Sequence, residues 1–143
     1  MKITTVIDPT CEEEIIVRLK EECPLPLKIA ELIERFDTVF MGYSEGRIER
    51  LLPKDLVCVT VDGGRVYAVT ADGRFMLKKR LYEVEELLGE DFMKINQSCL
   101  VRIDAIKCFE TTFGGSLCVR MKNGFCDYVS RRQLKHVKER MKI

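Results

Sequence analysis

The chain has 143 residues, 46% of them hydrophobic, and a formal net charge of +1 at pH 7. This length fits one domain of ordinary size, or one domain with a small appendage. No apolar run approaches the ~20 residues of a membrane span, and the run Ile3–Ile7, which ends at Asp8, is too short for a signal peptide. We therefore expect a soluble cytoplasmic protein without membrane insertion.

Residues 1–45 have the pattern of a small α/β appendage. The expected elements are a strand at residues 2–7, a helix that begins at a Thr10–Glu13 capping box, a second helix at Leu27–Phe36 and a strand at Thr38–Tyr43. Pro24 and Pro26 separate the two helices, because proline lacks the N–H donor that a helix needs. Two interpretations stay open for this appendage: a packing element, or a dimerisation region that makes the protein a homodimer.

Residues 46–143 change to short strands separated by glycine turns such as Asp62-Gly63-Gly64 and Asn123-Gly124. The expected strands are Arg47–Leu51, Leu56–Val61, Arg65–Thr70, Arg74–Leu77, Phe92–Val101, Ile106–Thr112, Leu117–Met121 and Phe125–Val129. Short helices are expected at Tyr82–Leu88 and Gln133–Met141. The sequence thus predicts a mainly β domain of mostly antiparallel strands, with small helices at its margins.

The seven cysteines contain no Cys-x-x-Cys pair. Five fall inside strand-like runs and are interpreted as buried, reduced thiols: Cys58, Cys99, Cys108, Cys118 and Cys126. The single histidine, His136, lies in a different kind of segment, so neither a zinc site nor a cofactor is expected. Cys11 and Cys23 leave redox sensing open.

The small net charge conceals an asymmetry. Residues 1–46 hold five Lys and Arg against ten Asp and Glu, whereas residues 47–143 hold nineteen against thirteen. A basic half suggests contact with nucleic acid, although a solvated basic face explains it as well. An enzyme is harder to assemble, because Ser98 and Ser130 have no base nearby in sequence and the glycines form no phosphate-binding pattern. We expect no catalytic activity; a site built from distant residues is the open alternative.

Basic and amide side chains gather at the ends of the expected strands. They are Arg65, Lys94, Asn96, Gln97, Arg131 and Arg132. Arginine suits bidentate contact with guanine or phosphate, and glutamine or asparagine suits adenine. Each residue also has a structural interpretation: Asn96 or Gln97 could satisfy a strand edge, and Ser130 is expected to cap the last helix. Arg131 and Arg132 at a helix N-terminus oppose the macrodipole, a small cost that an anion would explain.

The segment Phe92-Met93-Lys94-Ile95-Asn96-Gln97-Ser98-Cys99-Leu100-Val101, followed by Ile106, resembles the pattern F-x-R/K-h-H/N-x-S-h-h-V-N…I of the LytTR DNA-binding domain family. Val129-Ser130-Arg131-Arg132 resembles the closing V-S-R-R of that family. Residues 55–69 resemble its early strands, so the resemblance runs from about residue 46 to the C-terminus. The chain departs from the family at Gln97, where a basic residue is frequent, and at Arg102, where asparagine is usual.

The resemblance implies a fold of about ten strands whose loops enter successive major grooves of double-stranded DNA. By position, the family's DNA contacts fall on the turn at Gly64–Arg65, on Asn96–Gln97 and on Arg131–Arg132. We expect base or groove contacts from Arg65, Gln97 and Arg132. Phosphate contacts are expected from Lys94, Asn96, Arg131 and Lys135. The 46 preceding residues are too few for a receiver domain, so the chain resembles a stand-alone bacterial transcriptional regulator. Control would then act through the N-terminal piece, abundance or a regulatory protein partner. The competing interpretation is a protein-interaction or self-association module without DNA binding.

Overall fold

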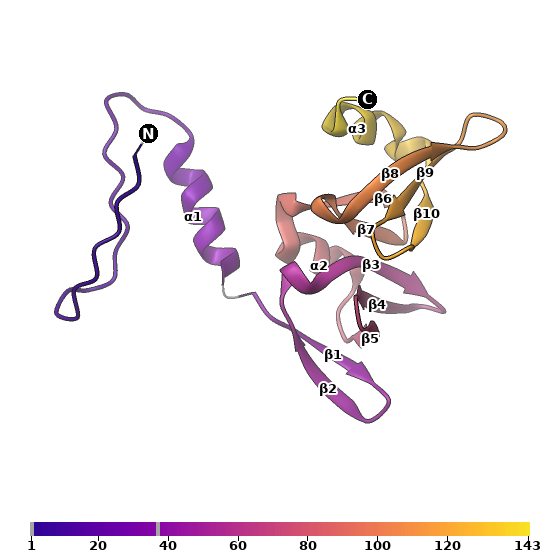
Figure 1. Cartoon of the computed structure of the whole chain (residues 1–143), viewed down its shortest axis with the longest axis horizontal. Coiled ribbons are helices and arrows are strands. Elements are labelled where there is room, and N and C mark those ends of the chain that lie inside the picture. Colours follow the sequence, from indigo (N-terminus) through magenta and orange to yellow (C-terminus); the bar gives the residue numbers. More distant parts are fainter. Residues whose placement is uncertain (1, 37) are drawn as a thin grey trace.

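The computed structural model describes residues 2–36 and 38–143, which form two antiparallel sheets and three α-helices (Figure 1). The seven-stranded sheet has the order β2-β1-β5-β4-β3-β7-β6. Its strands are β1 Phe40–Ser44, β2 Arg47–Leu51, β3 Leu56–Asp62, β4 Arg65–Thr70, β5 Gly73–Leu77, β6 Phe92–Asn96 and β7 Cys99–Arg102. The three-stranded sheet consists of β8 Ile106–Thr111, β9 Leu117–Met121 and β10 Cys126–Tyr128. The prediction of about ten short, mostly antiparallel strands is confirmed.

The helices are α1 Leu25–Phe36, α2 Leu81–Leu88 and α3 Arg131–Met141. Within the described residues, no helix is long and apolar enough to cross a membrane. The large sheet has a hydrophobic cluster on each face, because successive buried side chains of its central strands point to opposite faces. Leu56, Val59 and Leu100 join Val84 and Leu88 of α2 on one face. On the other face the core is shared with the small sheet and α3; it includes Val57, Val101, Val119 and Val137.

The structure contradicts two expectations for the N-terminal residues. Residues 2–24 contain neither the strand at 2–7 nor a helix after Thr10. Instead, the Asp8 carboxylate accepts hydrogen bonds from the Thr10 backbone N–H at 3.0 Å and from its hydroxyl at 2.7 Å. A short helix without packing partners is marginal in water. The second helix does form, and it begins at Leu25 because proline at position 26 is tolerated in a first turn.

The single strand expected at Phe92–Val101 is also wrong. These residues form the β6–β7 hairpin, in which Met93 pairs with Val101 and Asn96 with Cys99. The Asn96 side-chain Oδ1 accepts a hydrogen bond from the Ser98 backbone N–H at 2.8 Å, which closes the turn without glycine or proline. The chain therefore reverses at Gln97–Ser98, beside the polar residues that interrupt the apolar pattern of the expected strand.

Only two of the five cysteines expected in the core are buried. Cys58 and Cys99 are fully buried, Cys108 and Cys118 are half-buried, and Cys126 is exposed. Register places the last three on the outer face of the small sheet, since Cys108 and Cys126 both pair with Arg120. A three-stranded sheet with one solvated face explains why an apolar-looking run does not imply burial there.

Burial raises the pKa of the Cys58 thiol to about 12, with a smaller contribution from Asp127, and it also raises that of Cys99. Iodoacetamide at neutral pH is therefore expected to label exposed Cys11, Cys23 and Cys126 in the native protein, but Cys58 and Cys99 only after denaturation. Because the unfolded chain releases the Cys58 proton first, stability should fall as the pH rises from 9.0 toward about 12. Equal labelling rates at Cys58 and Cys126 would contradict the burial argument.

Candidate nucleic-acid interface

Three segments that are distant in sequence meet at one end of the fold. They are the β3–β4 turn at residues 62–65, the β6–β7 turn at residues 97–98 and the N-terminal turn of α3. The backbone N–H of Val61 donates to the Ser98 carbonyl at 2.8 Å, which joins the first two segments. The N–H of Ser130 donates to the Ile95 carbonyl at 2.9 Å, which joins the last two. We call these three segments the interface loops.

The β3–β4 turn carries Arg65 at the end of two central strands of the sheet. Gly63 and Gly64 have φ values of 57° and 77°, a conformation that glycine adopts without steric cost. Arg65 follows directly, is exposed and pairs in register with Asp62. Its guanidinium is thus carried on a tight hairpin rather than on a long loop.

Two basic residues in or just after β5, in the sheet that carries Arg65, lie over aromatic rings. The Arg74 guanidinium lies 3.9 Å from the Tyr67 ring centroid and 3.1 Å from the Asp62 carboxylate. The Lys78 ammonium lies 4.4 Å from the Tyr43 ring centroid. Such cation–π contacts hold the cations over the sheet surface. The contact between Arg74 and Tyr67 could have been found from the strand register. The Asp72-Gly73 turn places Val69 opposite Arg74, so Tyr67 is the diagonal neighbour of Arg74.

The β6–β7 turn exposes Gln97 and buries the residue before it. Asn96 is 1% exposed, and its Nδ2 donates to the Tyr128 carbonyl at 2.9 Å while its Oδ1 serves the turn. The phosphate contact expected of Asn96 therefore has no accessible amide to make it, and the side chain instead ties β6 to the end of β10. Gln97 extends from this fixed support into solvent.

The N-terminus of α3 carries two exposed arginines. The Ser130 hydroxyl accepts a hydrogen bond from the Gln133 backbone N–H at 3.3 Å, so the expected cap is confirmed. Arg131 and Arg132 occupy the first turn, which holds no acidic residue. Lys135 lies one turn after Arg131 and is also exposed. Positive side chains and helix N–H groups together make this end attractive to anions.

Lys94 lies apart from the interface loops. It is half-buried in a groove between α2 and α3 that Glu85, Glu86 and Glu90 also line. Arg140 lines the same groove, but the three carboxylates around it oppose the approach of phosphate. The structure thus brings together Arg65, Gln97, Arg131 and Arg132, extends them with Lys135, and separates Lys94 and Asn96 from the set.

Comparisons with known proteins assign most of the chain to one family of domains. The family model of the LytTr DNA-binding domain matches residues 46–142. Uncharacterized HTH-type transcriptional regulators of Staphylococcus aureus strains NCTC 8325 / PS 47 and COL are each 33% identical over 103 residues, which cover 72% of this chain and 70% of theirs. The structure of a LytTr DNA-binding domain from Bacillus cereus, part of a protein described as a methyl-accepting/DNA response regulator, superposes with a TM-score of 0.67 at 18% identity. That match covers 72% of this chain and 95% of that one.

The match of the family model includes every interface loop and extends through α3. The sheet itself begins earlier, since β1 pairs with β2 and β5. The segments that carry the resemblance in sequence, β6–β7 and the start of α3, are the ones that the fold joins. This chain belongs to the LytTR DNA-binding domain family.

Proposed function

We propose that this protein is a transcriptional regulator that binds specific sequences of double-stranded DNA through loops that enter the major groove. The observation that carries the proposal is the convergence of the exposed side chains Arg65, Gln97 and Arg132 on joined turns at one end of the fold. The relatives are named as HTH-type regulators. Here, in the described part of the chain, five strands separate α2 from α3, which favours turns over a recognition helix as the reading element.

The side-chain chemistry suggests separate roles. Arg65 and Arg132 can each donate two hydrogen bonds to a guanine, and Gln97 can pair with an adenine edge. Arg131 and Lys135, along the helix flank, suit phosphate and would set the register on the duplex. We leave Lys94 and Asn96 out of the contact set because of the acidic groove and the buried amide described above.

The experiment that tests the proposal is selection of bound sequences from random duplex DNA, followed by affinity measurements over a salt series. Neutralising each phosphate should give a slope of about −0.9 in log K against log salt. Enrichment of a defined motif, with a steep salt dependence, is expected. A module that only contacts protein would enrich no sequence and would show no retention on duplex DNA, and that result would reject the proposal.

We also propose that α1 mediates a homodimer, so that two copies occupy repeated half-sites in the cytoplasm. In Figure 1, α1 stands apart from the β domain. Its side chains Leu32 and Ile33, which lie on one face of the helix, are 63% and 48% exposed. An apolar helix face of this kind is typical of an interaction site. Residues 1–46 carry an excess of acidic side chains, which repel one another in two identical copies. The proposed contact would therefore depend on apolar packing.

The variant Leu32→Glu is expected to convert the dimer to monomer, because it places a charge in the proposed contact. Light scattering coupled to gel filtration measures the mass directly, and Glu31→Gln on the same helix is the matched control. Affinity for a single half-site should stay within twofold, while binding to two adjacent half-sites should lose its cooperativity. A wild-type protein that is monomeric both free and on DNA would contradict this prediction.

A further inference from the structure

The loop between β8 and β9 holds an aromatic side chain entirely in solvent. Phe113 is 108% exposed, the highest value among the large exposed hydrophobic side chains. Gly114 and Gly115 follow with φ values of 95° and 83°, which glycine alone adopts readily. Around them, the Thr112 N–H donates to the Ser116 carbonyl at 2.8 Å and the Gly115 N–H to the Thr112 carbonyl at 3.1 Å. The ring is thus presented at the tip of an ordered turn.

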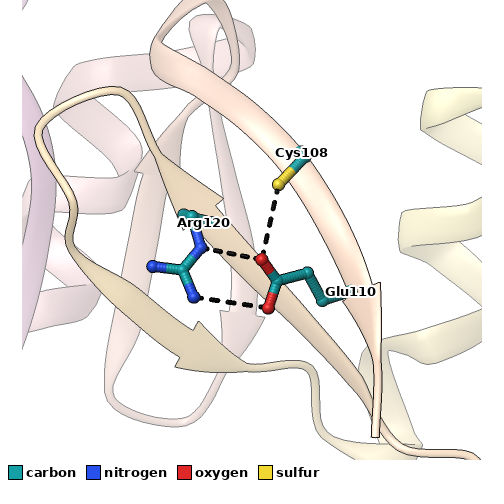
Figure 2. Close-up of polar contacts among 3 residues, drawn as sticks. All are labelled: Cys108, Glu110 and Arg120. Carbon is teal, nitrogen blue, oxygen red and sulfur yellow. Dashed lines mark hydrogen bonds and ion pairs between the residues drawn. The ribbon is translucent and has the colours of Figure 1, made fainter.

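An exposed ion pair and buried side chains connect the two strands that carry this loop. Figure 2 shows the Arg120 guanidinium donating two hydrogen bonds to the Glu110 carboxylate on the neighbouring strand. The Nε–Oε1 and Nη2–Oε2 distances are 2.8 Å and 3.3 Å. This pair lowers the pKa of Glu110, and the carboxylate also accepts a 3.8 Å contact from the Cys108 thiol. On the inner face, Leu117 and Val119 are buried in the core. Two anchored strands therefore hold the tip in a fixed direction.

The loop end of the same hairpin adjoins the interface loops. The Val129 N–H donates to the Leu117 carbonyl at 2.7 Å, one residue before the Ser130 cap of α3. In Figure 1 the β8–β9 loop extends beyond α3 toward the side on which the β3–β4 turn also projects. Residues 111–116 contain threonine, glycine, serine and the phenylalanine but no acidic side chain. The loop thus continues the proposed interface without adding repulsion toward phosphate.

We propose that this loop is a further DNA-contacting element, in which the Phe113 ring packs against bases in a groove next to the one that the α3 N-terminus reaches. The inference rests on the proposed function and extends it. Apolar side chains inserted at base steps are a known means of holding and bending duplex DNA. Small neighbours suit close approach of the backbone, and the anchored hairpin limits the ordering that binding would require. The alternative is that the ring contacts a protein partner instead of DNA.

The chain has no tryptophan, so Phe113→Trp introduces a single indole at the loop tip. The probe is a labelled duplex obtained by selection with the wild-type protein. Binding is followed by anisotropy of the label, and the indole emission is recorded in the same titration. We expect the emission to be quenched by at least half, because bases that stack on an indole quench it. Tyr82→Trp is the control: it replaces a 61% exposed aromatic on α2, across the sheet, and its emission should stay unchanged.

The variant Phe113→Ala should bind the duplex about tenfold more weakly at fixed salt, with an unchanged salt slope because no charge is lost. Tyr82→Ala should bind like wild type. If the duplex binds while the indole at position 113 keeps its free emission, the loop is not a DNA contact and the inference fails alone. If the wild-type protein selects no duplex and binds none, the proposed function fails first. An indole that responds to a cell extract freed of DNA, but not to DNA, would assign the ring to a protein partner and overturn the inference.

Discussion

Replacing Arg132 with alanine is expected to weaken binding to the selected duplex by about 1–3 kcal/mol, a factor of about 5–150. Arg132 is exposed in the first turn of α3, beside the turn that carries Gln97. A bidentate contact with guanine discriminates strongly, because the wrong base leaves both donors without partners. The loss should therefore be larger for the selected duplex than for a scrambled duplex of the same length. Both affinities are measured by anisotropy at one salt concentration.

The control for charge is Arg50→Ala, which removes an exposed arginine from β2, at the opposite edge of the large sheet. It should leave both affinities near wild type. Arg131→Ala and Lys135→Ala should instead weaken both duplexes alike and reduce the salt slope by about one phosphate each. If Arg132→Ala also weakens both duplexes equally, Arg132 holds phosphate and does not read a base.

The parts of the fold that sequence predicted are those with local signals. The glycine turns at residues 62–64 and 123–124 marked hairpins that are present, because positive φ angles there require glycine. The helix expected at Tyr82–Leu88 begins one residue earlier, at Leu81, and ends at Leu88 with Gly89 as its C-cap. The terminal helix also starts earlier, at Arg131, under the Ser130 cap. These features depend on a few neighbouring residues and need no knowledge of the whole fold.

The predictions that were wrong have a common physical cause. They depend on packing partners that are distant in sequence. Ile15, Ile16 and Leu19 have helical spacing but are 65%, 64% and 39% exposed, so no packing stabilises a helix there. The outer face of the small sheet exposes Cys126, although Cys126 and Cys58 both lie in runs with the pattern of a strand. The convergence of Arg65 with Gln97 depends on β3 lying beside β7, an order that no local pattern specifies. The family resemblance supplied that link at the level of sequence.

Asn96 is the residue at which sequence and structure differ most: the sequence suggests a phosphate contact, whereas the structure buries the side chain. We expect Asn96→Ala to lower the free energy of unfolding by about 1–3 kcal/mol, the cost of a polar group left without its partner, because both hydrogen bonds of this buried amide are lost and both are part-buried. The Tyr128 carbonyl loses its donor and the Ser98 N–H loses its acceptor. Urea denaturation followed by circular dichroism measures the change.

The neighbouring variant Gln97→Ala provides the matched comparison. Its side chain is exposed, so stability should stay within about 0.5 kcal/mol of wild type, while affinity for the selected duplex falls. Asn96→Ala should lower that affinity less, once the measurement is made at a temperature where the variant is folded, since the amide only positions the turn. If Asn96→Ala instead unfolds at the wild-type urea concentration and loses affinity like Gln97→Ala, the amide contacts DNA directly. The buried hydrogen bonds to Tyr128 and Ser98 would then not be its main role.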